Sequence, residues 1–270
     1  MSLAETAALL GAGFAAGGIN VIVGSGTLLT FPTLLALGYS PVVANVTNTV
    51  GLVPGSAAGI WGYREEVREF RGQGSRLARL TAASFSGAIV GALLLLVLPA
   101  EAFKAIVPVL ILLALVLIVL QPRLAKRIAA RRAAAAEDGV APPRHGGWAV
   151  FAAVFGTGVY GGYFGAAQGV LLMAILGITF ADRLQVLNGV KNVLACVVNA
   201  VAAVVFIVAG ALPGSGADHP SVVWPAALTI ALGAVVGGQI GARVGRRLSP
   251  TVLRALIIVV GLVAVARMLF

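Results

Sequence analysis

The stretch that decides the fold runs from residue 182 to residue 199 and reads Asp182-Arg-Leu-Gln-Val-Leu-Asn-Gly-Val-Lys-Asn-Val-Leu-Ala-Cys-Val-Val-Asn199. After Arg183 the chain carries a single charge, Lys191, before it reaches Asp218. The surrounding residues are those of a membrane-spanning helix, where an ammonium costs about 3 kcal/mol on insertion scales. Because a charge at that depth is seldom kept without a use, Lys191 is the first candidate functional residue.

The composition of the whole chain supports the membrane assignment. Of the 270 residues, 60% are hydrophobic and 10% are charged, and the mean hydropathy is +1.03. These values lie far from those of a soluble domain. Several apolar stretches also reach the roughly 20 residues that a helix needs to cross a hydrocarbon core. The predicted fold class is therefore an all-α polytopic integral membrane protein.

Glycine, proline and charge clusters divide the chain into eight to ten helical segments, about five in each half. The expected bounds are 3–23, 26–38, 41–62, 76–98, 102–121, 147–163, 166–177, 182–210, 221–242 and 250–269. The segments at 26–38 and 166–177 are too short to span alone, and each follows a glycine-rich break. The charged stretch 122–146 is an expected cytoplasmic linker, which separates a first transmembrane repeat, 1–121, from a second, 147–270.

The basic residues alternate between loops. Positive charge gathers in 63–79, 122–146 and 243–250, whereas the turn at 99–104 has only Lys104 and the loop at 211–220 has no Lys or Arg. This positive-inside bias places the basic loops in the cytoplasm and both termini outside, in the cytoplasmic (inner) membrane of a cell. Topology thus accounts for the net charge of +10, which argues against nucleic acid as a partner.

The two halves of the chain resemble each other. Asn45-Val-Thr-Asn48 corresponds to Asn188-Gly-Val-Lys191, and Gly26 precedes the first of these motifs by the same distance as Gly169 precedes the second. With an odd number of segments in each half, the halves form two inverted repeats. Inverted repeats are typical of transporters, whose binding sites lie near the midplane where broken helices meet.

Polar residues on two of these segments define a candidate substrate-binding site. The spacing i, i+3, i+4 places the polar residues around Lys191 on one helical face and those around Asn48 on another. Both faces lie roughly 10 to 13 Å from one end of their helices. The glycine-rich breaks would face them with free N–H groups and helix N-termini, which attract anions. The full candidate set is Gly24, Ser25, Gly26, Asn45, Asn48, Thr49, Gln168, Gly169, Asn188, Lys191 and Asn192.

A lysine with amide and hydroxyl donors, and no carboxylate inside an expected span, suits a small oxyanion. Two plainer interpretations stay open: Lys191 could bind the freed carbonyls of a broken helix, and the Asn and Thr residues could bond only between helices. We do not expect an enzyme, because the sequence has no His pair, Ser–His arrangement or metal-ligand cluster, and no cofactor or metal is implied. An anion channel and a non-transporting scaffold or assembly protein are the alternatives.

Motifs in both halves carry a family resemblance. They are Ala44-Asn-Val-Thr-Asn-Thr-Val50, Pro54-Gly-Ser56, Gly62-Tyr-Arg-Glu65, Gly161-Gly-Tyr-Phe-Gly165, Leu187-Asn-Gly-Val-Lys-Asn-Val-Leu194, Asn199 and Gly237-Gly-Gln-Ile-Gly-Ala-Arg243. These residues resemble the TauE/SafE family of membrane permeases, also called the sulfite exporter or toluenesulfonate uptake family. The resemblance covers essentially the whole chain outside the linker. It implies a secondary transporter for sulfite, thiosulfate, sulfonates or related organosulfur anions.

The direction of transport stays open. The sequence has no Gly-x-x-x-x-Gly-Lys-Ser/Thr phosphate-binding loop, so ATP hydrolysis by this chain is not expected. The membrane potential alone expels an anion from a cell that is negative inside, by about 2.3 kcal/mol per charge per 100 mV. Export is therefore the default, and import would need a co-transported proton or cation. The expected partners are the small anion and the lipid bilayer, with a homo-oligomer possible in principle.

Overall fold

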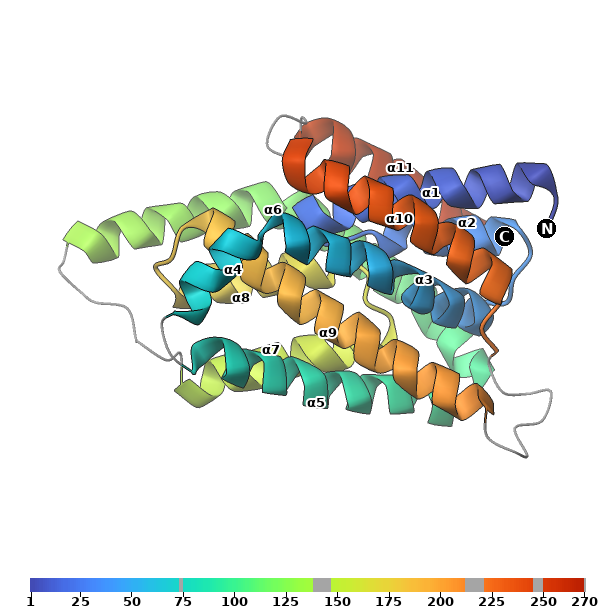
Figure 1. Cartoon of the computed structure of the whole chain (residues 1–270), viewed down its shortest axis with the longest axis horizontal. Helices are drawn as coiled ribbons and strands as arrows, with labels where there is room; N and C mark the ends of the chain where they lie inside the picture. The colour runs from blue at the N-terminus through green and yellow to red at the C-terminus, as the bar shows by residue number, and fades with distance from the viewer. Residues whose placement is uncertain (73–74, 138–146, 212–220, 245–249, 270) are drawn as a thin grey trace.

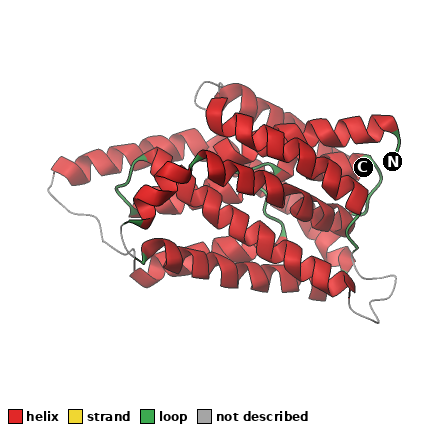
Figure 2. Ribbon diagram, viewed as in Figure 1, coloured by secondary structure: helices red, strands yellow, loops and turns green. Residues whose placement is uncertain are grey.

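All regular structure in the described part of the chain is helical. The computed structural model describes residues 1–72, 75–137, 147–211, 221–244 and 250–269, and in these ranges it contains eleven α-helices and no strand (Figures 1 and 2). In chain order the helices are α1 (Leu3–Ile22), α2 (Thr27–Ala36), α3 (Pro41–Gly62), α4 (Arg64–Arg71), α5 (Arg76–Val97), α6 (Ala100–Glu137), α7 (Gly147–Tyr163), α8 (Gln168–Thr179), α9 (Leu184–Ala211), α10 (Trp224–Val244) and α11 (Pro250–Leu269).

Several helices have the length and composition of membrane spans. Among the described residues, five qualify: Leu3–Ile22, Arg76–Val97, Ala100–Ala130, Leu184–Ala211 and Trp224–Arg243. Large apolar side chains cover their outer faces; Val97, for example, is 79% exposed. An apolar outer surface of this extent fits lipid and not water. The predicted all-α polytopic membrane fold is confirmed.

The two short helices turn back instead of spanning. Helix α2 leads back toward the end of the molecule where α1 begins, and α3 starts at that same end (Figure 1). Helix α8 returns in the same way to the opposite end, where α7 begins and α9 starts (Figure 1). With 10 and 12 residues, α2 and α8 are too short to cross a bilayer. The molecule therefore contains two re-entrant hairpins, α1–α2 and α7–α8, which enter from opposite ends.

The helix pairings of the first half have counterparts in the second. Helix α1 packs on α10, as α7 packs on α5; α3 packs on α10, as α9 packs on α5. Helix α2 contacts α11, as α8 contacts α6. Exchanging the two halves thus maps these pairings onto one another, as an inverted repeat requires. The exact repeat bounds, 1–121 and 147–270, stay a prediction.

Two sequence-based expectations need correction. Helix α6 does not end at residue 121 but continues through Pro122 to Glu137, because residues 123–137 are rich in Ala, Arg and Lys, which favour helix. The remainder of the expected linker, 138–146, lies outside the described residues. The expected loop 63–79 contains the helix α4, whose Phe70 is fully buried and packs edge-on against the ring of Phe180. The charged segment 63–79 thus includes a short amphipathic helix.

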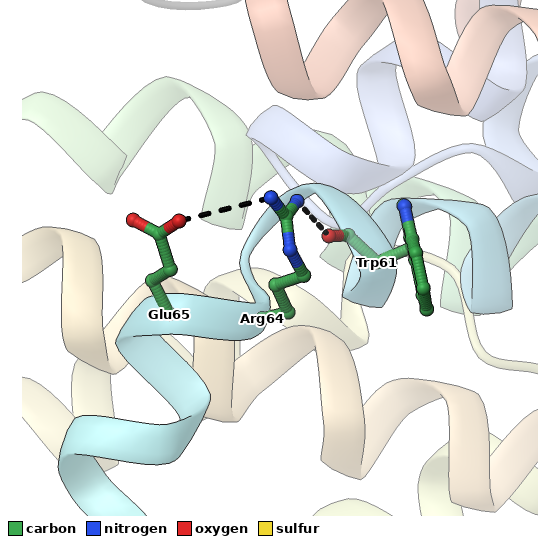
Figure 3. Close-up of polar contacts among 3 residues, drawn as sticks. All are labelled: Trp61, Arg64 and Glu65. Carbon is green, nitrogen blue, oxygen red and sulfur yellow. Dashed lines mark hydrogen bonds and ion pairs between the residues drawn. The ribbon is translucent and has the colours of Figure 1, made fainter.

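The corner between α3 and α4 is held by an arginine. The Arg64 guanidinium donates a hydrogen bond to the carbonyl of Trp61 at 3.2 Å and lies 3.7 Å from the carboxylate of Glu65 (Figure 3). The same guanidinium carbon lies 5.7 Å from the centroid of the Trp61 ring. A cation at the C-terminus of α3 is favoured by the helix dipole. The start of α1 and the end of α11 lie at the end of the molecule opposite this corner (Figure 1).

Candidate functional site

The two glycine-rich breaks meet inside the molecule. The backbone N–H of Gly169 donates a hydrogen bond to the carbonyl of Gly24 at 3.0 Å. A Cβ on Gly24 would lie 2.3 Å from Cα of Gly169, so no larger residue fits without movement of the backbone. Gly24 also has φ +83°, a conformation that side chains disfavour. The hairpins α1–α2 and α7–α8 therefore cross at these two glycines.

Each broken helix ends in the same way. At the end of α1, the N–H groups of Val23 and Gly24 both donate to the carbonyl of Ile19. At the end of α7, the N–H groups of Phe164 and Gly165 both donate to the carbonyl of Tyr160, and Gly165 has φ +78°. Such a left-handed glycine stops a helix and leaves carbonyls of its last turn without helical partners. The helix ends thus supply free acceptors deep in the protein.

Lys191 binds the carbonyls at the end of α1. Its Nζ lies 2.9 Å from the Val21 carbonyl oxygen and 3.2 Å from that of Asn20. The amide nitrogens of Asn188 and Asn192 donate to the same Val21 oxygen, at 3.2 and 3.4 Å. The three side chains share one face of α9, as their spacing predicts. The helix dipole places partial negative charge at this end of α1, which stabilises the ammonium.

This geometry is the plainer arrangement that the sequence leaves open for Lys191. The residue is 0% exposed and is the only charged side chain among the described buried residues. An ammonium has three N–H donors, and the two carbonyls occupy two of them. One donor therefore remains for a ligand. Holding the α1 end and binding an anion are compatible tasks for the same group.

Asn48 and Asn45 form a second cluster at the end of α7 and the start of α2. The Asn45 amide donates to the carbonyl of Tyr163 at 3.0 Å. The Asn48 amide oxygen accepts a hydrogen bond from the Thr30 hydroxyl, and its nitrogen lies 3.4 Å from Oγ1 of Thr27. Helix α9 thus binds the end of α1, and α3 binds the end of α7, so each binds the broken helix of the other half. Thr49 does not join this cluster, since its hydroxyl donates to its own helix, at the carbonyl of residue 45.

The two clusters are not joined by a hydrogen bond in the described part of the chain. The Lys191 cluster surrounds the end of α1, whereas the Asn48 cluster surrounds the end of α7 and the first turn of α2. The two polar faces that the sequence predicts thus lie in two separate patches, which flank the Gly24–Gly169 crossing. Their role in binding substrate stays a prediction.

Several candidate residues carry buried polar atoms without a hydrogen-bond partner among the described residues. These atoms are Oγ of Ser25, Nε2 of Gln168, and Oδ1 of Asn45 and Asn188. Ser25 and Gln168 are 1% and 3% exposed, and both belong to the breaks. Native proteins leave few such atoms unpaired, and those that remain point to bound water, an ion or a ligand. These four atoms lie on residues that the sequence selects, whereas Oγ of Ser84 and the Tyr163 hydroxyl are unpaired among the described residues outside the predicted set.

A cavity of about 320 Å³ reaches the Lys191 cluster. It extends from Leu184 and Gln185 in the first turn of α9 to Asn188 one turn deeper, with α6 and α8 as its other walls. The Asn188 nitrogen faces the Val21 carbonyl, so its unpaired oxygen is directed elsewhere. The cavity therefore leads from the end of the molecule that carries α4 to the candidate site.

Sequence reasoning missed three contributors. Asn20 supplies a carbonyl to Lys191, and its side-chain nitrogen lies 3.2 Å from Oγ of Ser56, which ties α1 to α3. Thr27 and Thr30 complete the shell of Asn48 from the first turn of α2. A lone Asn inside the apolar end of a span, and two Thr residues three apart directly after a glycine break, are the signals that could have found them.

Known proteins resemble this chain, in one case over nearly its full length. The sequence model of the family described as "Sulfite exporter TauE/SafE" matches residues 9–268. An Escherichia coli K12 protein described as "Probable membrane transporter protein YfcA" is 27% identical over 265 residues, which cover 94% of this chain and 86% of that protein. A Sinorhizobium protein described as "Probable membrane transporter protein ORF9" is 33% identical over 100 residues, 37% of each chain. No solved structure matches the chain.

Proposed function

This chain is a membrane transporter that belongs to the sulfite exporter TauE/SafE family, and we propose that it moves a small sulfur-containing anion across the cytoplasmic membrane by alternating access. Sulfur in the substrate rests on the description of the family. Sulfite, thiosulfate and organosulfonates are the candidates. That the substrate is an anion is supported separately, by the chemistry of the described residues.

The observation that carries the anion proposal is the buried ammonium of Lys191. No carboxylate is among the described buried residues, so the cation is balanced only by two backbone carbonyls and the dipole of α1. The C-terminal end of a helix carries about half an elementary negative charge, which is less than the full positive charge of the ammonium. The site therefore keeps a net positive charge. An arriving oxyanion would complete this balance and take the third N–H of the ammonium.

Neutral donors near the breaks would replace the water of the anion. The Gln168 nitrogen and the Ser25 hydroxyl are buried and unpaired, and both can donate. Helices α2 and α8 begin beside the same crossing, and their dipoles favour an anion there, although the N–H groups of Leu28, Gln168 and Gly169 already have backbone acceptors. One charge with several neutral donors is the composition that a small, strongly hydrated oxyanion needs when it leaves water.

Alternating access would use the two hairpins. In this structure a cavity links the Lys191 cluster to the end that carries the basic residues of α4. Because basic loops are retained in the cytoplasm, we assign this end to the cytoplasm and both termini to the outside. Re-entrant hairpins that enter from opposite ends and cross at two glycines provide a pair of elements that can rock about a fixed site.

Transport by purified protein in liposomes tests this proposal. We would measure the flux of radiolabelled sulfite and thiosulfate through the wild type, Lys191→Gln and Lys104→Gln, the last of which removes an exposed lysine of α6. The wild type and Lys104→Gln should show saturable flux, and Lys191→Gln should lose at least about tenfold, because it loses a charge-assisted hydrogen bond. Equal flux in all three proteins would reduce Lys191 to a structural residue, and a large flux that does not saturate with substrate would indicate a channel.

A further inference from the structure

A second cavity, of about 400 Å³, lies between the first turns of α5 and α7, apart from the Lys191 cluster. Its lining combines two arginines, Arg76 and Arg79, with apolar side chains that include Leu80, Val150 and Phe151. Both helices begin at the end of the molecule to which we assign the cytoplasm (Figure 1). The cavity thus joins positive charge at a membrane surface with an apolar wall.

The two arginines are held differently. Arg76 lies 3.8 Å from the carboxylate of Asp182, and its guanidinium carbon lies 5.5 Å from the centroid of the Phe180 ring. Its position is therefore fixed at the edge of the cavity. Arg79 follows almost one turn later and is exposed, and its guanidinium has no hydrogen bond or ion pair with any described residue. Arg79 is the cation that is available to a ligand.

The opposite wall has the features of a membrane interface. Trp148, in the first turn of α7, lines the cavity and is 83% exposed. Its ring centroid lies 5.4 Å from that of Phe151, one turn deeper. Tryptophan concentrates at the level of lipid headgroups, and the N–H groups at the start of a helix bind phosphate. Gly147 brings the backbone of this helix start into the lining.

We propose that this cavity binds one anionic phospholipid. The headgroup phosphate would lie between the Arg79 guanidinium and the start of α7. An acyl chain would follow Leu80, Val150 and Phe151 toward the membrane interior. Basic pockets between membrane helices on the cytoplasmic side are suited to anionic headgroups, and the apolar wall favours a lipid over free phosphate. This site is independent of the transported anion.

Fluorescence of Trp148 provides the test. The full chain with Trp61→Phe and Trp224→Phe leaves Trp148 as the only tryptophan. This protein is placed in nanodiscs of phosphatidylcholine that contain an increasing fraction of dibrominated phosphatidylglycerol or, in a parallel series, of dibrominated phosphatidylcholine, since bromine quenches tryptophan on contact. We expect half-maximal quenching at about a fivefold lower fraction of the anionic lipid, the effect of one arginine near a membrane surface.

Arg79→Gln should abolish this preference, whereas Arg123→Gln, which removes an exposed arginine of α6, should keep it. Excess inorganic phosphate should not relieve the quenching. Equal quenching by both lipids would overturn the proposal. An equal loss of the lipid preference in the two arginine variants would show only a general attraction of the basic surface for anionic lipid. Relief of the quenching by phosphate would show a site for free anions instead.

Discussion

The crossing of the two broken helices makes a prediction that four alanine substitutions can test. Gly169→Ala would place a Cβ 2.4 Å from Cα of Gly24, a distance that backbone atoms cannot accommodate without a shift. Forcing an extra methyl into a packed contact costs about 1–3 kcal/mol. Gly24→Ala would meet the same contact at 2.3 Å and would also hold alanine at φ +83°, which adds about 1–2 kcal/mol.

Two other glycines separate these effects. Gly38 has φ +90° and no atom within 4 Å of a built Cβ, so Gly38→Ala isolates the conformational cost of about 1–2 kcal/mol. Gly11 lies on the outer face of α1 with nothing within 4 Å, so Gly11→Ala should stabilise the helix by roughly 0.5–1 kcal/mol. The predicted order of stability is Gly11→Ala, wild type, the two single-effect variants, and Gly24→Ala last.

Thermal unfolding of the detergent-purified variants measures this order. Each kcal/mol corresponds to roughly 2–4 °C in Tm for a chain of this size. The decisive comparison is Gly169→Ala against Gly11→Ala, since both place alanine in a helix and differ only in what the new methyl meets. If the two variants melt together, the hairpins do not touch at Gly24 and Gly169, and the site has a different architecture.

Two further predictions concern the Asn48 cluster and the contact of α4 with α9. Thr30→Val removes the donor to the Asn48 amide oxygen and should lower the free energy of unfolding by about 1–3 kcal/mol. Thr33→Val is the control and should change this free energy less, because the Thr33 hydroxyl bonds only to its own helix. Equal Tm values for the two variants would contradict the Asn48 cluster. Glu69→Gln breaks the ion pair with Arg183, but the two side chains are 44% and 67% exposed, so Tm should not change at low or high salt. A salt-dependent drop in Tm would show that this pair holds α4 to α9.

The sequence predicts the frame of the molecule because membrane helices leave strong local signals. Long apolar runs locate the spans, and the glycine breaks locate α2 and α8 to within a few residues. The face shared by Asn188, Lys191 and Asn192 also follows from spacing alone, since helical periodicity is fixed. These properties depend on neighbours in the chain.

What the sequence does not provide depends on long-range packing. The acceptor of Lys191 is a carbonyl 170 residues away, on a helix end that exists only because Gly24 stops α1. Any of several free backbone groups could have met the ammonium. Helix α4 is missed for another reason: its eight residues are strongly polar, and the buried Phe70 becomes informative only when its partner Phe180 is known.

The central claim is that the Lys191 ammonium binds the transported anion while it holds the end of α1. Isothermal titration of sulfite and thiosulfate into purified wild type, Lys191→Gln and Lys104→Gln measures this most directly, with folding of each variant checked by Tm. We predict that Lys104→Gln binds like the wild type and that Lys191→Gln, still folded, binds roughly 10- to 150-fold more weakly, the range for a charge-assisted hydrogen bond. Wild-type affinity in a folded Lys191→Gln would contradict the claim and leave Lys191 a purely structural residue.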